Sequence, residues 1–174
     1  MHRTESRHPG IDVDEVDAWM ATHIEGLTSP LRHLEQIPGG HSNLTYLVRD
    51  AADKRYVLSR PPLGELLPGA HDMTREYRAI EALGPTAVPV PDALGLCEDH
   101  DVTGADFYVM SFVEGHVLHD EQDVLATYGL GERHHSGLSL AEVLAALHAV
   151  DIDEVGLSGL GKREDYVGRQ LTRW

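Results

Sequence analysis

Apolar and polar residues follow two different periods along the first third of the chain. After Asp12, apolar residues recur every three or four positions, which predicts a helix from Asp12 to Glu25. A shorter period that is typical of strands follows, and turns with glycine, proline or aspartate interrupt it. We therefore expect a meander of three antiparallel strands, over residues 31–37, 43–49 and 55–60.

A second helix and two more strands are expected after this meander. The helix begins after Asp72, has apolar residues along one side and ends at Gly84-Pro85. Two apolar stretches then predict strands over Ala93–Cys97 and Phe107–Val113, on either side of an acidic loop. The order up to this point is therefore one helix, three strands, one helix and two strands.

The rest of the chain has a weaker pattern. Residues 114–137 are expected to be irregular, with at most a short helix near 123–128. Ser139 and Glu142 form a capping-box pattern that predicts the start of a helix, and residues 166–174 are helix-like again. The helix after Ser139 has an apolar stripe made of Leu140, Val143, Leu144 and Leu147.

Charge and cysteine content narrow the range of partners. The 174-residue chain has 29 acidic and 14 basic residues, so its formal net charge is −15. Such a surface repels phosphate backbones and anionic lipids, which argues against nucleic acid and membrane surfaces as partners. Cys97 is the only cysteine and lies in an apolar run, so we expect a buried thiol. These features indicate a cytoplasmic protein.

The sequence Pro-Gly-Gly-His-Ser-Asn at residues 38–43 lies between two expected strands and is the first candidate for chemistry. Two adjacent glycines let the backbone approach a ligand closely, and its N–H groups, with the Ser42 hydroxyl, can hold phosphate oxygens. No Gly-Lys-Ser/Thr follows, so this turn is not a Walker A loop. Because such a turn is more often an ordinary hairpin, its function depends on the context.

Six short sequences give that context. They are Gly39–Tyr46, Tyr56–Pro62, Arg75–Arg78, Val88–Pro91, Phe107–Gly115 and Leu144–His148. In this order they closely resemble the phosphotransferase family that includes the aminoglycoside kinases. The branch that they resemble most is the one whose members are fused to, or encoded beside, acyl-CoA dehydrogenases. The resemblance runs from about residue 30 to the end of the chain.

The resemblance implies an α+β fold in three parts. Residues 1–10 would be a loose N-terminal arm. Residues 11–113 would form a protein-kinase-like N-lobe, with a five-stranded antiparallel sheet, one helix of the αC type and an additional N-terminal helix. Residues 114–174 would hold the hinge, the linker and the first helices of a helical C-lobe that is truncated before its catalytic loop.

The resemblance also implies a binding site for ATP. The glycine turn would hold the phosphates, the backbone of Phe112 and Val113 would contact adenine, and Met110 would lie behind the ring. Glu76 would orient the cation that binds the phosphates. The expected cofactor-binding residues are Gly39, Gly40, His41, Ser42, Asn43, Val57, Arg60, Glu76, Met110, Phe112 and Val113.

The phosphate-binding cation is the point at which the chain departs from the family pattern. The third strand has Ser59 where a basic residue is expected. The next residue, Arg60, is basic, but alternation along a strand turns it to the opposite face unless a bulge accompanies Pro61. The hypothesis is that Arg60 pairs with Glu76 or with the nucleotide phosphates.

The residues that carry out phosphoryl transfer are missing from the sequence. Transfer needs a base that orients the acceptor hydroxyl and carboxylates that hold Mg²⁺. In the family these come from a His-x-Asp loop followed by Asn and Asp, and nothing between Val150 and Trp174 matches them. We therefore expect a fragment with no catalytic or metal-binding residues of its own, in which Mg²⁺ binding belongs to the full-length protein.

Two functions of different classes remain open. The first is the ATP-binding lobe of an enzyme that transfers the γ-phosphate to a hydroxyl of a small molecule, a hydroxyacyl-CoA or hydroxy acid in first place and an aminoglycoside in second. The alternative is a non-catalytic nucleotide-binding or interaction module, which Ser59 favours. As an isolated lobe, the chain is expected to self-associate through the helix around Leu140–Leu147.

Overall fold

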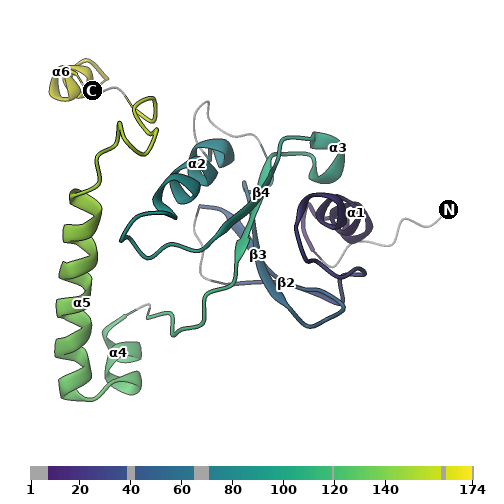
Figure 1. Cartoon of the computed structure of the whole chain (residues 1–174), viewed down its shortest axis with the longest axis horizontal. Coiled ribbons are helices and arrows are strands. Elements are labelled where there is room, and N and C mark those ends of the chain that lie inside the picture. The colour runs from purple at the N-terminus through teal and green to yellow at the C-terminus, as the bar shows by residue number, and fades with distance from the viewer. Residues whose placement is uncertain (1–7, 39–41, 65–70, 119, 162–163, 174) are drawn as a thin grey trace.

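The computed structural model describes residues 8–38, 42–64, 71–118, 120–161 and 164–173. One antiparallel sheet lies at its centre. Its strands are β1 (His33–Gln36), β2 (Leu44–Arg49), β3 (Arg55–Arg60), β4 (Ala93–Cys97) and β5 (Phe107–Ser111). They lie side by side in the order β1-β2-β3-β5-β4, so that β3 is the middle strand (Figure 1).

Six helices accompany the sheet in the described part of the chain. They are α1 (Val13–His23), α2 (Met73–Leu83), α3 (His100–Thr103), α4 (Glu121–Thr127), α5 (Leu130–His148) and α6 (Tyr166–Arg173). The helices α1 and α2 lie on opposite sides of the sheet, whereas α4, α5 and α6 stand apart from it (Figure 1). The sheet with α1 and α2 is therefore one packed unit, and the later helices extend away from it.

The predicted five-stranded sheet and its meander are confirmed. Consecutive strands from β1 to β3 pair antiparallel, and β3 and β4 are as long as their patterns indicated. Both long helices of this unit begin at the expected aspartates, because the Asp12 side chain accepts from the N–H of Asp14 at 3.1 Å and Asp72 accepts from Arg75 at 2.9 Å. Strand β5 ends at Ser111, two residues earlier than expected.

The acidic loop between β4 and β5 was predicted without a helix, and this prediction is wrong. It contains α3, which Asp99 caps by accepting from the N–H of Asp101 at 3.0 Å. Gly104, with φ of +79°, ends the helix in the left-handed conformation that favours glycine. Both capping signals are present in the sequence, but four residues are too few to show a helical period.

The short helix predicted near residues 123–128 is present as α4, but residues 130–137 are helical rather than irregular, so the predicted helix start at Ser139 is wrong. Helix α5 begins nine residues earlier, at Leu130, and the Glu132 carboxylate accepts from the Gly129 N–H at 2.8 Å. Gly131 and Gly137 lie inside this helix, where a glycine costs only about 1 kcal/mol relative to alanine. Gly129 is therefore the N-cap of α5, and the predicted capping pattern at Ser139 and Glu142 lies inside the helix.

The main core lies between α1 and one face of the sheet. Val16 and Met20 of α1 are fully buried, and the Trp19 ring meets the Phe107 ring edge-on, with centroids 4.9 Å apart. A Cβ at Gly95 of β4 would lie 2.9 Å from the Ile24 side chain, so glycine lets the end of α1 approach the sheet. The sheet residues of this core are Leu34, Tyr46, Val48, Tyr56, Leu58, Cys97, Phe107 and Val109.

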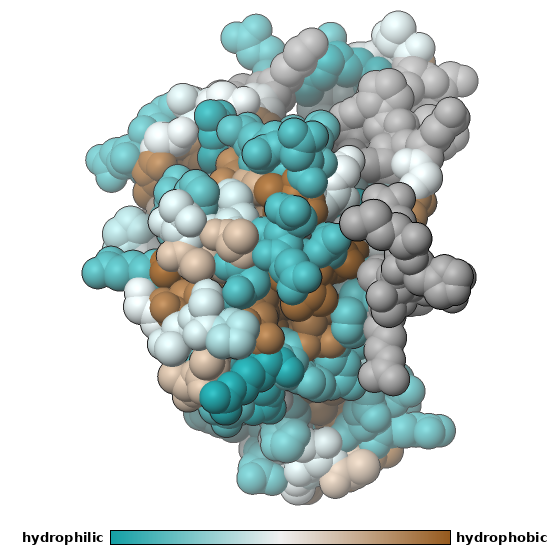
Figure 2. All heavy atoms as spheres, turned by 90° about the vertical axis from the view of Figure 1, so that its right-hand side faces the viewer, coloured by the Kyte–Doolittle hydropathy of each residue, from teal (hydrophilic) through white to brown (hydrophobic). Residues whose placement is uncertain are grey.

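The surface outside this core is predominantly polar. On the side of the molecule that carries α1, polar and charged residues cover most of the face, with apolar patches between them (Figure 2). No helix among the described residues combines the length and the apolar character that crossing a membrane requires. Cys97, expected to be buried, is 1% exposed, and burial raises the pKa of its thiol.

Asp50 is a buried carboxylate that joins the segment after α1 to the turn between β2 and β3. Its oxygens accept from the N–H groups of Thr28, Ala52 and Lys54, at 3.0, 2.9 and 2.9 Å. Burial opposes the charge, but these hydrogen bonds outweigh it and lower the pKa of Asp50. Burial and this carboxylate together raise the pKa of Tyr56, which donates to Asp50, to about 12.

The substitution Asp50→Asn is expected to lower the free energy of unfolding by about 3 kcal/mol near neutral pH, because buried N–H groups lose their acceptor. The lowered pKa means that the carboxylate stabilises the fold above its unfolded pKa and that this stability is lost as the pH falls through the folded pKa. The difference between the two proteins should therefore shrink below about pH 4. Urea unfolding across this range measures it.

The matched control is Asp53→Asn in the same turn. Asp53 is exposed, has φ of +63°, and pairs with Arg49 at 3.0 Å. Asparagine tolerates this conformation, and an exposed ion pair contributes little, so the change should stay within about 0.5 kcal/mol. Equal losses for the two variants would show that Asp50 has no special role.

Candidate functional site

The side chains of β3 alternate between the two faces of the sheet. Tyr56 and Leu58 point into the core under α1, and Val57 and Ser59 point to the other face, where α2 lies. The pairing of β3 with β2 runs without a bulge from Arg55 to Arg60, opposite Arg49 to Leu44. This regular register decides which β3 residues can contribute to a site on the α2 side.

A cavity of about 720 Å³ opens on this second face of the sheet. It is lined by one residue of β3, by residues of β1, β2 and β5 or just after them, and by the proline segment before β4. The lining residues are Ile37, Thr45, Leu47, Val57, Pro89, Val90, Pro91, Met110, Ser111, Phe112, Val113, Gly115 and Val117. Nearly all of them are apolar, so the cavity fits a flat, weakly polar group.

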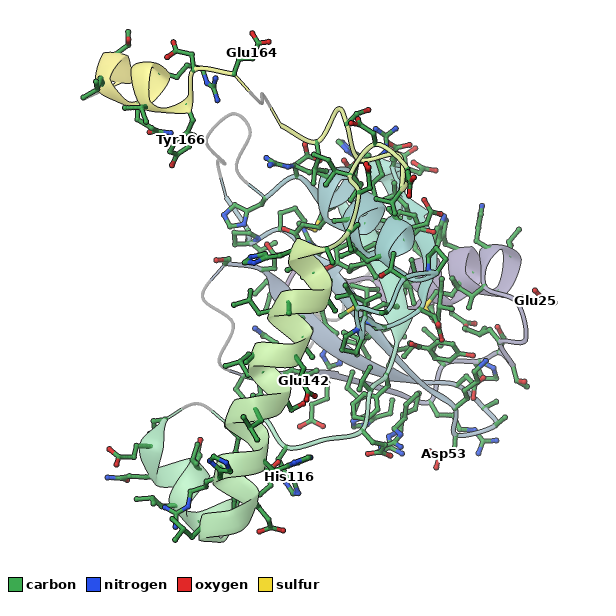
Figure 3. All side chains as sticks on the ribbon, turned by 60° about the vertical axis from the view of Figure 1, so that its left-hand side comes forward. Glu25, Asp53, His116, Glu142, Glu164 and Tyr166 are labelled. Carbon is green, nitrogen blue, oxygen red and sulfur yellow. The ribbon has the colours of Figure 1, made fainter. Side chains whose placement is uncertain are left out.

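The far wall of this cavity is formed where the chain leaves β5. The Arg55 guanidinium lies over the Phe112 ring at 4.4 Å and pairs with Glu114. From there the chain passes His116 and continues to α4 and α5, which stand apart from the sheet (Figure 3). The structure thus brings together four of the residues expected in the nucleotide site, Val57, Met110, Phe112 and Val113.

A polar cluster on the α2 side of the sheet surrounds Glu76. The Asn43 amide donates to both oxygens of the Glu76 carboxylate, at 3.2 and 2.9 Å. The Tyr108 hydroxyl of β5 donates to the same carboxylate at 3.3 Å. Glu76 therefore points toward the sheet and joins the start of β2 to β5.

Ser59 extends this cluster to the middle strand. It lies opposite Tyr108 in the β3–β5 register, is 3% exposed, and forms a side-chain hydrogen bond with the Tyr108 hydroxyl. Because Tyr108 gives its proton to Glu76, its oxygen accepts from Ser59. Burial, together with the Glu76 carboxylate, raises the pKa of Tyr108. The chain of hydrogen bonds therefore runs from Ser59 through Tyr108 to Glu76.

His71 belongs to the same cluster and was missed in the sequence. Its Nδ1 lies 2.9 Å from the Asn43 Oδ1, and since the Asn43 amide nitrogen faces Glu76, this ring nitrogen is the donor. His71 has φ of +57°, an uncommon conformation for a residue other than glycine. No spacing rule connects His71 to Asn43, because the two meet only when α2 packs on the sheet.

The prediction that Arg60 pairs with Glu76 is wrong. Arg60 points to the α1 face, where its Nη1 donates to the Gly10 carbonyl and its Nε is buried without a hydrogen-bond partner. It is 3% exposed, and burial lowers the pKa of the guanidinium, although the nearby Tyr46 acts in the opposite direction. The absence of a bulge before Pro61 gives the physical reason, since strict alternation separates Arg60 from the cavity.

The glycine turn is described only in part. Gly39, Gly40 and His41 lie outside the described residues, whereas Ser42 is exposed at the end of the turn. Asn43 follows it directly and is held by Glu76, so this end of the turn is anchored to α2. Within the described ranges, no three His, Cys, Asp or Glu side chains gather into a group that could hold a metal ion.

This arrangement defines a class of protein. A five-stranded antiparallel sheet, a helix glutamate facing it and an apolar cavity beside its middle strand form a kinase-like lobe. The family model described as "Phosphotransferase enzyme family" matches residues 33–174. The chain belongs to this family.

Several curated proteins that are similar to this chain are named acyl-CoA dehydrogenases. "Probable acyl-CoA dehydrogenase IBR3" of Arabidopsis thaliana is 37% identical over 99% of the chain. "Acyl-CoA dehydrogenase family member 10" of Mus musculus is 38% identical over 89% of it, and family member 11 of Gallus gallus is 40% identical over 81%. The chain spans only 21%, 14% and 18% of the lengths of these three proteins.

A solved structure has the same fold. It is that of a Ralstonia eutropha JMP134 protein that carries the provisional name of an aminoglycoside phosphotransferase. The two chains are 38% identical, with a TM-score of 0.75, over 94% of this chain and 46% of the other. The expected kinase-like fold is therefore confirmed.

The substitution Glu76→Ala tests the polar cluster. It removes the acceptor of Asn43 and of Tyr108, both partly buried, so the free energy of unfolding should fall by about 1–2 kcal/mol. Arg78→Ala at an exposed position of the same helix should cost less than about 0.5 kcal/mol. Chemical denaturation of both variants measures this, and equal losses would contradict the role given to Glu76.

Proposed function

We propose that this chain is the ATP-binding lobe of a small-molecule phosphotransferase. The observation that carries the proposal is the apolar cavity of about 720 Å³ on the sheet face where Val57 and Met110 meet the segment after β5. An adenine ring is flat and apolar on both faces, and it needs backbone hydrogen bonds at one edge. The chain at Phe112 and Val113, beyond the last paired residue of β5, can offer them.

The phosphates of the nucleotide would lie at the glycine turn, which ends at Ser42 and Asn43, and Asn43 contacts Glu76 of α2. Mg²⁺ would accompany ATP only in the full-length protein, because the carboxylates that hold it in the family are missing here. In this proposal residues 11–113 are the N-lobe, and residues 114–174 are the linker and the beginning of a second lobe. The cytoplasm would supply the ATP.

The acceptor would be a hydroxyl group of a small molecule. The names of the relatives favour a hydroxyacyl-CoA or a hydroxy acid, and the name of the solved structure keeps an aminoglycoside as the second choice. The chain on its own is expected to transfer no phosphate, since it contains no His-x-Asp loop followed by Asn.

The substitution Val57→Phe is the direct test of the cavity. A larger side chain at this position fills the space proposed for adenine, so affinity for adenosine and for ATP should fall at least about tenfold. Isothermal titration calorimetry measures both affinities. Val167→Phe on α6 makes the same change at an exposed position and should leave them unaltered.

Unchanged adenosine affinity in Val57→Phe would place the nucleotide elsewhere. Absence of adenosine binding by the unsubstituted chain would rule out the proposed function in this lobe.

A non-catalytic interaction module is the second candidate, and one observation favours it. Ser59 occupies the position of the expected cation, so the cluster on this face of the sheet consists of the Glu76 carboxylate and neutral partners. Loss of phosphate-binding charge is expected in a lobe that no longer transfers phosphate. Restored transfer when a C-lobe of the solved relative is joined to this chain would contradict this candidate.

We also propose that the chain associates with itself through α5. Three leucines of its predicted stripe are exposed, Leu140 at 71%, Leu144 at 49% and Leu147 at 42%. A continuous apolar stripe of this kind stabilises contact between copies when it is buried. Sedimentation velocity should show dimers at tens of micromolar, and the double substitution of Leu144 and Leu147 to Glu should abolish them. A monomer at all concentrations would contradict the proposal.

A further inference from the structure

The partners of Glu76 differ in charge from those that a phosphate site needs. The two groups that donate to its carboxylate are the Asn43 amide and the Tyr108 hydroxyl, and both are neutral. The next member of the cluster, Ser59, is neutral as well. The carboxylate is therefore satisfied by hydrogen bonds, and its negative charge is not balanced by a cation among these partners.

The basic side chains of the sheet are engaged elsewhere. Arg60 is held on the opposite face by the Gly10 carbonyl, and Arg55 pairs with Glu114 and lies over Phe112 at the other end of the cavity. Lys54 lies over the Tyr56 ring on the α1 side. Glu76 forms no ion pair within the described part of the chain.

His71 is the ionisable group that contacts the cluster through Asn43. Its Nδ1 gives its proton to the Asn43 carbonyl, so in the neutral ring Nε2 is an acceptor and cannot donate to a phosphate. His71 also borders a second cavity of about 510 Å³, together with Arg60, His100 and Asp106. Of these, His100 already pairs with Asp106 at 2.8 Å.

The charges on this face of the sheet therefore favour binding of the adenine end of a nucleotide over binding of its phosphate end. The apolar cavity stabilises the adenine ring by burying its surface. Each added phosphate brings negative charge toward Glu76, on a chain whose net charge is already −15, without a paired cation in return. Backbone N–H groups of the glycine turn can offset this repulsion, but they add no net charge.

We propose that Ser59 is a specificity-determining residue that makes this site recognise the nucleoside part of a nucleotide and respond little to the number of phosphates. This inference rests on the proposed function, because it assumes that the cavity holds adenine. Ser59 determines this preference because it lies on the face of the sheet that carries the cavity, between Thr45 of β2 and Tyr108 of β5. A single tyrosine hydroxyl separates it from the Glu76 carboxylate.

A basic residue at position 59 would change this balance. Its longer side chain would extend toward Glu76 from the place that the Ser59 hydroxyl now occupies, beside Tyr108. There an ammonium group would neutralise the carboxylate and attract phosphate oxygens. Serine is too short to do either, and it leaves Glu76 to its function of anchoring Asn43 and the end of the glycine turn.

The test compares ligands that differ only in phosphate number. Adenosine, AMP, ADP and ATP are titrated into the 174-residue chain by calorimetry at about pH 8, where histidine is ordinarily neutral, with and without Mg²⁺. The dissociation constants are expected to agree within about threefold. ATP binding more than about tenfold tighter than adenosine would overturn the inference and leave the proposed function intact. Failure of adenosine to bind would reject both.

The substitution Ser59→Lys should raise the affinity for ATP about tenfold and leave that for adenosine unchanged. As the control, Ser158→Lys adds the same charge at an exposed turn and should not alter the ratio of ATP affinity to adenosine affinity. Circular dichroism and thermal unfolding show whether the buried lysine is tolerated. A folded Ser59→Lys variant with an unchanged ratio contradicts the inference, and if it does not fold, the ligand series on the unsubstituted chain decides.

Discussion

The alternation of side chains along β3 is the constraint on which the rest of this structure depends. The strand lies in the middle of the sheet, paired with β2 on one side and β5 on the other, and neither pairing with β3 contains a bulge. Tyr56 and Leu58 therefore belong to the core, while Val57 and Ser59 belong to the cavity side. A slip by one residue would exchange the two sets, and burial on both faces prevents it.

Packing of the core under α1 fixes this register, and it also holds Arg60 on the face of the sheet opposite the cavity. Tyr46 donates to the Pro9 carbonyl at 2.7 Å and Arg60 to that of Gly10, so the segment before α1 is tied to the sheet. The hydrogen bonds of Asp50 hold the opposite end of α1 near the β2–β3 turn. A buried guanidinium that already stabilises this packing cannot reach a ligand on the other face of the sheet.

The cavity and the polar cluster divide the second face into two chemical environments. Around Val57 and Met110 the surface is apolar and suits a flat ring. Around Glu76 the carboxylate is held by hydrogen bonds from neutral donors. Under the proposed function, these two environments would receive the two ends of one nucleotide. The serine at position 59 would then affect only the end near Glu76.

The sequence by itself determined the elements of the lobe, because periods, caps and turn residues are local signals, and six short sequences in a fixed order carried the family resemblance. The local signals determined the α1 and α2 starts at Asp12 and Asp72 and the five strands. They failed at α3, which is too short to show a period, and at the start of α5, because the capping pattern at Ser139 lies inside that helix. Only the tertiary structure decided that Arg60 faces Gly10, and that His71 and Asn43 meet beside Glu76. Those contacts join residues far apart in the chain, and they form only when helices pack on the two faces of one sheet.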